Sequence, residues 1–372
     1  MKRRSFLKKA GLGLAASSAV ISPAIAQQMP EVRWRLQASY PKSLDTLFGG
    51  TEFIAKRVAE LTDGKFQIRV FAAGEIVGAL QVLDAVGAGT VEMGHTAPYY
   101  YFGKDPAFAF GTALLFGMNT RQHNAWWHHG GGAEAMAPLF KDYGCVALLA
   151  GNTGAQMGGW FRKEIKSVDD LRGLKFRIAG LGGVVLSKLG VVPQQLGGPD
   201  IYPGLERGTI DAAEWSGPYD DEKLGFNKVA KFYYYPGFWE GSTGLTTLIN
   251  EKKWNELPKA YQAALQAASA EANSWMPAKY DAQNPAALRR LVATGTQLRA
   301  FPRAVLEAAE KAAYEVYDEL SAKSAHFKRI YPGWRKFRDE QFLWFRVTEH
   351  SFDSYVFNSK VGRSGPSEKL KK

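Results

Sequence analysis

The stretch from Ile201 to Tyr219, IYPGLERGTIDAAEWSGPY, decides the fold, because the earlier stretch from Leu83 to Tyr101, LDAVGAGTVEMGHTAPYYY, is written in nearly the same way. In the shared frame Gly89 lies over Gly208, followed by Thr-Val-Glu and Thr-Ile-Asp. Each copy predicts a helix end, a glycine in the left-handed conformation, a short apolar strand and a polar, aromatic loop. We expect two related α/β units with loops at strand ends, where open α/β sheets bind small molecules.

Length and composition favour a two-domain globular protein. The chain has 372 residues, 46% hydrophobic and 22% charged, which is long for a single core. The formal net charge is +11, or about +6 once the five cations of residues 1–26 are removed. No basic helix with interleaved aromatics and no nucleic-acid motif is present, so the charge favours small anions and we expect no nucleic-acid partner.

The first 26 residues predict an export signal. A basic stretch, MKRRSFLKK, precedes the apolar run GLGLAASSAVIS, and Ala24-Ile25-Ala26 offers small residues for cleavage. The sequence RRSFLK is also typical of a twin-arginine signal, so this route and general secretion both stay open. We therefore expect a periplasmic protein. Cys145 is the single cysteine of the chain, which excludes an internal disulfide and favours a buried, inert thiol.

Alternating strand and helix patterns predict two lobes. We expect lobe I over 27–149 plus about 241–280, and lobe II over 150–240 plus about 281–325. A long aromatic helix over 326–360 and a basic tail over 361–372 complete the chain. This helix has two interpretations: it packs across its own chain, or its aromatic face docks on a second subunit to form a homodimer.

Arg177 is the first candidate for substrate binding. In LRGLKFRIAG, Lys175 and Arg177 alternate with apolar residues on a predicted strand. A guanidinium near the carboxyl end of that strand would face the cleft and could hold a carboxylate with two parallel hydrogen bonds. The alternative is a surface arginine on an edge strand.

Several oxygen-bearing residues suggest a cation site. Glu214 and Trp215 end the second repeat strand, Gln156 follows Asn152-Thr153-Gly154, and Glu240 follows Trp239. Oxygen ligands suit a hard cation such as sodium or calcium, and no soft ligand set for zinc or copper accompanies them. The alternative is that these side chains form ordinary salt bridges or lie on the surface.

Two other motifs give weaker evidence of function. The glycines of Gly180-Leu181-Gly182-Gly183 lack the spacing of a dinucleotide fingerprint, and we interpret them as a helix start. His128 and His129 are adjacent, so on a helix they point about 100° apart and cannot share a metal. We interpret them as surface or packing histidines.

Three segments together resemble a known family. GEIVGALQVLDAVGAGTVEMG, DLRGLKFRIAG and VVPQQLGGPDIYPGLERGTIDAAEWSGP occur in this order. They resemble the extracytoplasmic solute receptors of tripartite ATP-independent periplasmic (TRAP) transporters, the DctP-like family. The EWSGP sequence and the long C-terminal helix are most similar to its 2-oxoacid (pyruvate-like) and lactate receptors. The resemblance implies an α/β, two-lobed, type II-like periplasmic binding protein with mixed sheets and an inter-lobe cleft.

The resemblance also assigns roles to residues. It implies that Arg177 grips the substrate carboxylate, and that Gln156, Glu214 and the main-chain carbonyl of Trp215 bind a metal cation, with Glu240 as a further candidate. The remaining candidates for substrate contacts are Asn152, Trp215, Tyr100 and Tyr101.

Three functions follow as hypotheses. The first is a receptor that closes on a small organic acid beside a sodium or calcium ion and delivers it to TRAP membrane subunits, without catalysis and without an organic cofactor. The second is a twin-arginine-exported oxidoreductase or other enzyme, against which stand the single cysteine and the absence of a G-x-S-x-G elbow. The third is a sensor subunit.

Overall fold

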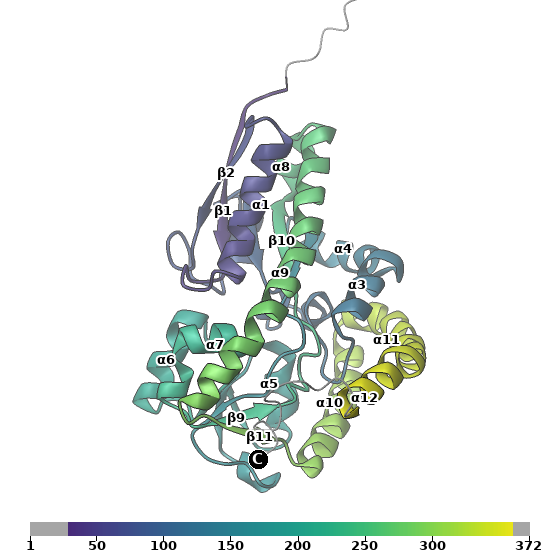
Figure 1. Cartoon of the computed structure of the whole chain (residues 1–372). Coiled ribbons are helices and arrows are strands. Elements are labelled where there is room, and N and C mark those ends of the chain that lie inside the picture. The colour runs from purple at the N-terminus through teal and green to yellow at the C-terminus, as the bar shows by residue number, and fades with distance from the viewer. Residues whose placement is uncertain (1–28, 360–372) are drawn as a thin grey trace, which may run out of the picture. The chain divides into compact units, whose positions relative to one another are not determined.

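The first sheet has the strand order β2-β1-β3-β10-β4 (Figure 1). β1 pairs in parallel with β2 and β3, whereas β10 is antiparallel to β3 and β4. β10 therefore returns to this sheet after the chain has built most of the second one. The bounds are β1 Val32–Ala38, β2 Phe66–Phe71, β3 Met93–Thr96, β4 Cys145–Asn152 and β10 Gly244–Asn250.

The second sheet has the order β11-β9-β5-β8-β6-β7. β6 runs parallel to β7 and β8, while β5 is antiparallel to β8 and β9. Both sheets are mixed, as the fold prediction requires. The bounds are β5 Gly159–Phe161, β6 Lys175–Arg177, β7 Val192–Gln194, β8 Ala212–Ala213, β9 Phe232–Tyr235 and β11 Gln297–Ala300.

This architecture comes from a computed structural model, which describes residues 29–359. The predicted export signal and the basic tail lie outside the described residues. The chain divides into two units at Glu31, and the strands and helices of both sheets belong to the unit that starts at Val32. Between residues 29 and 359, no helix is both long enough and apolar enough to cross a membrane.

Helices flank the sheets and connect their strands (Figure 1). Their bounds are α1 Leu47–Leu61, α2 Val82–Gly87, α3 Thr120–His129, α4 Gly132–Asp142, α5 Gly180–Ser187, α6 Gly198–Arg207, α7 Pro218–Leu224, α8 Glu251–Glu256, α9 Lys259–Ala293, α10 Arg303–Lys323, α11 Ala325–Phe345 and α12 Ser351–Asn358. Short 3₁₀ turns are η1 Pro98–Tyr101, η2 Pro106–Gly111, η3 Asp169–Leu171 and η4 Phe226–Lys228, and η5 Arg346–His350 is a π-helical turn.

The sequence repeat is a structural repeat. Gly89 follows α2 with φ +74° and Gly208 follows α6 with φ +71°, so both take the predicted left-handed conformation. A strand then begins four residues later in each copy, at Met93 and at Ala212. Each of these strands pairs in parallel with the first strand of its own unit, β1 or β6. The two copies thus hold equivalent places in the two sheets.

Helix α9 links the two sheets. It is a continuous helix of 35 residues that packs against α1 and β4 at one end and against α7 at the other (Figure 1). Met276 lies against Gly50 and Gly151 near the first sheet, and Tyr280 bonds to Asp220 beside the second. The predicted residue boundaries of the lobes stay a prediction.

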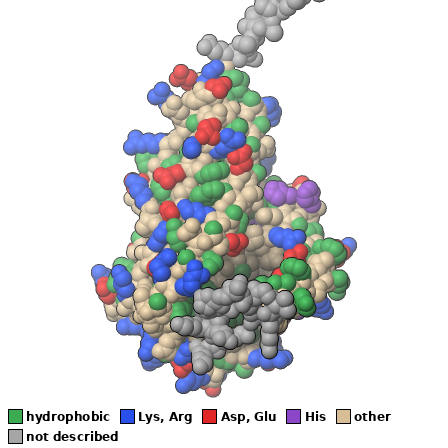
Figure 2. Space-filling model, in the orientation of Figure 1, with side chains coloured by type: hydrophobic (Ala, Val, Ile, Leu, Met, Phe, Trp, Pro, Cys, Tyr) green, Lys and Arg blue, Asp and Glu red, His purple; other side chains and the backbone are tan. Residues whose placement is uncertain are grey.

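The C-terminal helix divides into two halves. In α11, Phe327, Ile330 and Trp334 are buried against the body of the same chain, as the first interpretation predicts. Beyond η5 the aromatic side chains are exposed: Phe352 is 66% exposed and Tyr355 is 74% exposed. Figure 2 shows hydrophobic side chains gathered where Figure 1 places α11 and α12. Leu343 and Trp344 at the end of α11 are exposed as well, so the second interpretation concerns the part of the helix from Leu343 onward.

Candidate functional site

Arg177 is buried inside the second sheet. It ends β6, which lies between β8 and β7, and its side chain is 1% exposed, whereas Lys175 is exposed. The alternative of a surface arginine on an edge strand is therefore wrong. Its Nη1 donates to the carbonyl oxygen of Glu214 at 2.7 Å and to Glu214 Oε1 at 2.6 Å, and its Nε donates to the carbonyl of Leu196 at 3.1 Å. Nη2 is buried without a hydrogen-bond partner in the described structure.

Glu214 and Trp215 follow β8 directly. Glu214 Oε1 also accepts from the Ala179 amide at 3.2 Å, while its buried Oε2 has no partner among the described residues. The guanidinium of Arg177 lies 5.1 Å from the centre of the Trp215 ring. Burial raises the pKa of the Glu214 carboxyl, and the charge of Arg177 acts in the opposite direction. The Arg177 guanidinium and the Glu214 carboxylate are in direct contact and form a buried ion pair.

Gln156 and Glu240 both form hydrogen bonds with the hydroxyl group of Thr243. Gln156 Nε2 donates to Thr153 Oγ1 at 3.0 Å and to Thr243 Oγ1 at 2.7 Å, which leaves Gln156 Oε1 buried with no partner in the part of the chain described. The Thr243 hydroxyl in turn donates to Glu240 Oε2. Burial raises the pKa of Glu240 well above its usual value, and the nearby charge of Glu214 adds to this effect.

The two polar atoms of the Asn152 side chain have different environments. Its Oδ1 accepts hydrogen bonds from Thr120 Oγ1 at 3.0 Å, the Gly154 amide at 2.9 Å and the Thr243 amide at 3.2 Å. Its Nδ2 is buried and, within the described residues, has no partner. A spare amide donor at this point suits an anionic or carbonyl oxygen.

The three tyrosines after the first repeat have different environments. Tyr99 and Tyr100 stack with ring centres 5.1 Å apart and line a small cavity, and burial raises the pKa of Tyr100 to about 12. The Tyr101 hydroxyl instead accepts from the Leu83 amide at 3.1 Å and pairs with Thr96 Oγ1 at 2.9 Å. The structure brings Tyr100 to the cavity and places Tyr101 in the core.

The cavity joins the two repeat units, because its wall includes Tyr99 and Tyr100 from one and Trp215 from the other. Its volume is about 20 Å³, roughly the space of one water molecule. Side chains must therefore move when a carboxylate and a cation enter together. The other lining residues are Tyr40, Leu47, Ala97, Thr153, Gln156, Ser216, Thr243 and Leu245.

Sequence reasoning missed Tyr40 and Thr243 at this site. Tyr40 follows β1, so the rule that ligands bind beyond the carboxyl ends of strands could have found it. Thr243 lies in Ser242-Thr243-Gly244, where no motif distinguishes it. Arg177, Glu214, Asn152 and Glu240 are buried next to the lining residues and are not themselves among them.

The spare atoms fit a hard cation. The partnerless Glu214 Oε2 and Gln156 Oε1 are oxygens of the kind that sodium and calcium prefer. In residues 29–359 no three His, Cys, Asp or Glu side chains gather to hold a metal by themselves, so amide, main-chain and substrate oxygens would complete the shell. The other predicted features agree: His128 and His129 are exposed, and Cys145 is a buried thiol whose pKa burial raises to about 12.

Comparisons with known proteins identify the family of the chain. Residues 37–324 match the family model of bacterial extracellular solute-binding proteins, family 7 (DctP). The chain is 51% identical, over 97% of its length and 100% of the relative, to a monocarboxylate 2-oxoacid-binding periplasmic protein of Nostoc.

Two solved structures extend the comparison. One is a TRAP transporter solute-binding protein from Bordetella bronchiseptica, a mixed-occupancy dimer with copurified calcium and picolinate in one site; it is 56% identical, with a TM-score of 0.87, covering 88% of this chain and 98% of that one. The other, from Pseudoalteromonas atlantica with bound sodium and pyruvate, is 36% identical, with a TM-score of 0.84 and coverage of 87% and 99%.

Proposed function

Since the chain belongs to the bacterial extracellular solute-binding proteins of family 7, we propose that it captures a small 2-oxo or 2-hydroxy monocarboxylate, such as pyruvate or lactate, and delivers it to the membrane subunits of a TRAP transporter. The observation that carries the proposal is a set of buried atoms without a partner in the described structure: Nη2 of Arg177, which is in contact with Glu214 through Nη1, and the oxygens Glu214 Oε2 and Gln156 Oε1. A cationic donor and two anionic or carbonyl acceptors match a carboxylate accompanied by a metal ion.

Arg177 Nη2 takes the substrate carboxylate in this proposal. Leaving a guanidinium nitrogen buried without an acceptor is costly, so an anion that accepts from it is bound favourably. Asn152 Nδ2 and the tyrosine and tryptophan rings of the wall complete the contacts. The aromatic wall also excludes water, which strengthens the electrostatic contacts inside.

Gln156 Oε1, Glu214 Oε2 and the Trp215 carbonyl are the proposed cation ligands, with Glu240 as a further candidate. A bound sodium or calcium ion would supply positive charge that bridges these oxygens and the substrate. The Bordetella relative holds calcium with picolinate, and the Pseudoalteromonas relative holds sodium with pyruvate. The role of this chain is binding without catalysis and without an organic cofactor, and its location is the periplasm.

A homodimer through the C-terminal helix is part of the proposal. The exposed aromatic face from Leu343 to Phe357 is large for a solvated surface, and the Bordetella relative is a dimer.

Calorimetry with pyruvate and lactate, with and without calcium or sodium, tests the function. We expect binding that depends on the cation. Absence of binding to any small 2-oxo or 2-hydroxy acid, or an absorption spectrum showing a flavin or haem in the purified protein, would reject the proposal in favour of an exported enzyme.

A further inference from the structure

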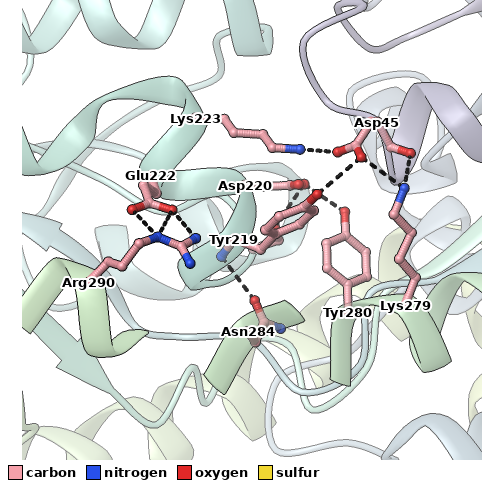
Figure 3. Close-up of polar contacts among 10 residues, drawn as sticks. Asp45, Tyr219, Asp220, Glu222, Lys223, Lys279, Tyr280, Asn284 and Arg290 are labelled. Carbon is pink, nitrogen blue, oxygen red and sulfur yellow. Dashed lines mark hydrogen bonds and ion pairs between the residues drawn. The ribbon is translucent and has the colours of Figure 1, made fainter. Parts of the chain in front are cut away.

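Asp45 forms a polar cluster with side chains from two other elements (Figure 3). It lies in the loop between β1 and α1. Its carboxylate contacts Lys223 Nζ, accepts from the Tyr219 hydroxyl at 3.0 Å and accepts from Lys279 Nζ at 2.9 Å. Lys279 also donates to the Asp45 carbonyl at 2.6 Å. One carboxylate is thus shared by two ammonium groups and a hydroxyl.

Tyr219 and Lys223 belong to α7, which is tied to the second half of α9 (Figure 3). The Tyr280 hydroxyl donates to Asp220 at 2.6 Å, and Asn284 accepts from the Tyr219 amide at 3.0 Å. Arg290 forms an ion pair with Glu222, also on α7. These contacts are spread along α9 from residue 280 to 290, so α7 is joined to this half of α9 at several points.

The first half of α9 is held by the other sheet. Met276 fills the space beside Gly50 of α1 and Gly151 of β4. The helix passes from one lobe to the other within the turn that contains Pro277, and a proline inside a helix removes a main-chain hydrogen bond and favours bending there. Lys279 therefore contacts Asp45 close to Pro277, whereas Tyr219 and Lys223 reach Asp45 from α7, beside the second sheet.

The cluster is continuous with the proposed binding site. α7 begins two residues after Ser216, which itself follows Glu214 and Trp215. The Ser216 amide donates to Asp221 Oδ1 at 3.3 Å, and its hydroxyl donates to Asp220 at 3.4 Å. A displacement of α7 would therefore move the segment that carries Glu214 and Trp215.

We propose that Asp45 is a closure latch: by holding Tyr219 and Lys223 it keeps α7, and with it the Glu214–Ser216 segment, in the position that encloses the ligand. The inference rests on the proposed receptor function. Asp45 acts as a positioning residue, since its carboxylate is occupied by Lys223, Lys279 and Tyr219. The latch stabilises the closed form over the open one, and so it slows release of the ligand more than it slows capture.

The test compares Asp45→Asn with Glu222→Gln. Each change neutralises one carboxylate in an ion pair that holds α7, but Glu222 lies on α7 itself and pairs with Arg290 of α9. With pyruvate and calcium, we expect Asp45→Asn to weaken affinity by about three- to tenfold, mostly through faster dissociation, because two partly exposed ion pairs are lost together. Glu222→Gln should change affinity by less than about twofold.

Salt gives a second readout. The latch is half exposed, since the Asp45 side chain is 49% exposed, so roughly 0.5 M salt should screen it. The affinity difference between wild type and Asp45→Asn should then shrink. Equal dissociation rates in wild type and Asp45→Asn, or an equal loss in Glu222→Gln, overturn the latch.

Spin labels separate failure of the latch from failure of the receptor function. Cysteines introduced as Glu52→Cys on α1 and Arg207→Cys on α6 are exposed, whereas Cys145 is buried. Pulsed electron resonance should give longer label distances in Asp45→Asn than in wild type. If wild type binds no small acid, the receptor function fails, and the ligand-free distances decide the latch: identical distributions in both chains overturn it.

Discussion

Arg177 binds Glu214 through one nitrogen alone: Nη1 donates to both the carbonyl oxygen and Oε1 of Glu214, at 2.7 and 2.6 Å, while Nη2 is left without a protein acceptor in the described structure. The pair is therefore both a structural ion pair and an open donor. Substitutions at this position must be chosen with both roles in mind.

Arg177→Lys should lose most substrate affinity while it keeps a positive charge beside Glu214. An ammonium group cannot serve Glu214 and a carboxylate with the fork geometry of a guanidinium, so we expect a loss of about 100-fold, or roughly 3 kcal/mol. Calorimetry with pyruvate and calcium measures it. Arg177→Ala is a poorer test, because removing one partner of a buried pair lowers stability by about 3–5 kcal/mol. Wild-type affinity in Arg177→Lys would remove the arginine from the site.

Glu214→Gln should separate the cation from the substrate. The amide keeps the size of the carboxyl but loses its charge, so affinity for calcium or sodium falls and substrate binding no longer rises when the cation is added. Titrations with and without calcium measure this. Glu92→Gln, which removes a surface partner of Arg35, is the control and should retain the cation dependence. Retained dependence in Glu214→Gln would contradict the ligand role.

Gly180→Ala should weaken ligand binding more than Gly173→Ala, a substitution that causes similar backbone strain. Gly180 has φ +55°, and a Cβ there would lie 3.0 Å from the Cβ and carbonyl oxygen of Tyr99 on the other lobe. Gly173 has φ +73° with nothing within 4 Å, so Gly173→Ala carries the strain of roughly 1–2 kcal/mol without the contact.

The comparison isolates the contact between lobes. Gly180→Ala should reduce pyruvate affinity while both variants lose similar thermal stability. Equal affinities in the two variants would show that the Tyr99 contact is irrelevant to binding.

Asp221→Asn should flatten part of the pH dependence of stability. Asp221 is buried; burial raises its pKa to about 7, although hydrogen bonds from Tyr233 and Trp160 act the other way. Since the folded pKa exceeds the unfolded one, this group's contribution to stability is present at low pH and is lost as pH rises from about 4 to about 7.

Urea unfolding at about pH 5 and about pH 8 checks this. The stability of wild type relative to Asp221→Asn should fall with rising pH, by up to about 1.4 kcal/mol per unit inside that window. Asp318→Asn, at an exposed position on α10, is the control. Parallel pH curves for wild type and Asp221→Asn would rule out the raised pKa.

The double change Trp344→Glu and Phe352→Glu should convert a dimer to a monomer. These side chains are 58% and 66% exposed on the C-terminal helix, and charges there oppose burial in an interface. Light scattering after size exclusion gives the mass. Val192→Glu, at a 44% exposed site on β7, should leave it unchanged. A wild-type monomer at micromolar concentration would reject the dimer.

Sequence patterns predict local structure well because the signals are local. The glycines at 89 and 208 fix left-handed turns, and alternation separates buried from exposed positions in the first half of β1, although in β6 both Phe176 and Arg177 are buried. The helix ends are harder to predict from periodicity: α6 begins at Gly198 and α5 begins at Gly180, within segments that contain several glycines. Apolar periodicity is weak in such glycine-rich segments.

The sequence predicts which types of residue form the site, but it predicts only part of how they are arranged. Glu214 and Arg177 are identified by their positions at strand ends, and the structure brings them into contact. Tyr100 and Tyr101 cannot be separated by sequence, because a single 3₁₀ turn sends adjacent side chains to the cavity and to the core. The Asp45 cluster joins residues up to 234 positions apart, and no local pattern encodes such a contact.

The length of helix α9 would amplify a small bend within it. The 16 residues that follow Pro277, up to the helix end at Ala293, span roughly 24 Å at the usual helical rise. A bend of about 10° at the proline would therefore carry the far end through about 4 Å, which exceeds the length of a hydrogen bond. A change too small to alter the fold at the pivot becomes a displacement that a membrane partner could detect at the opposite surface.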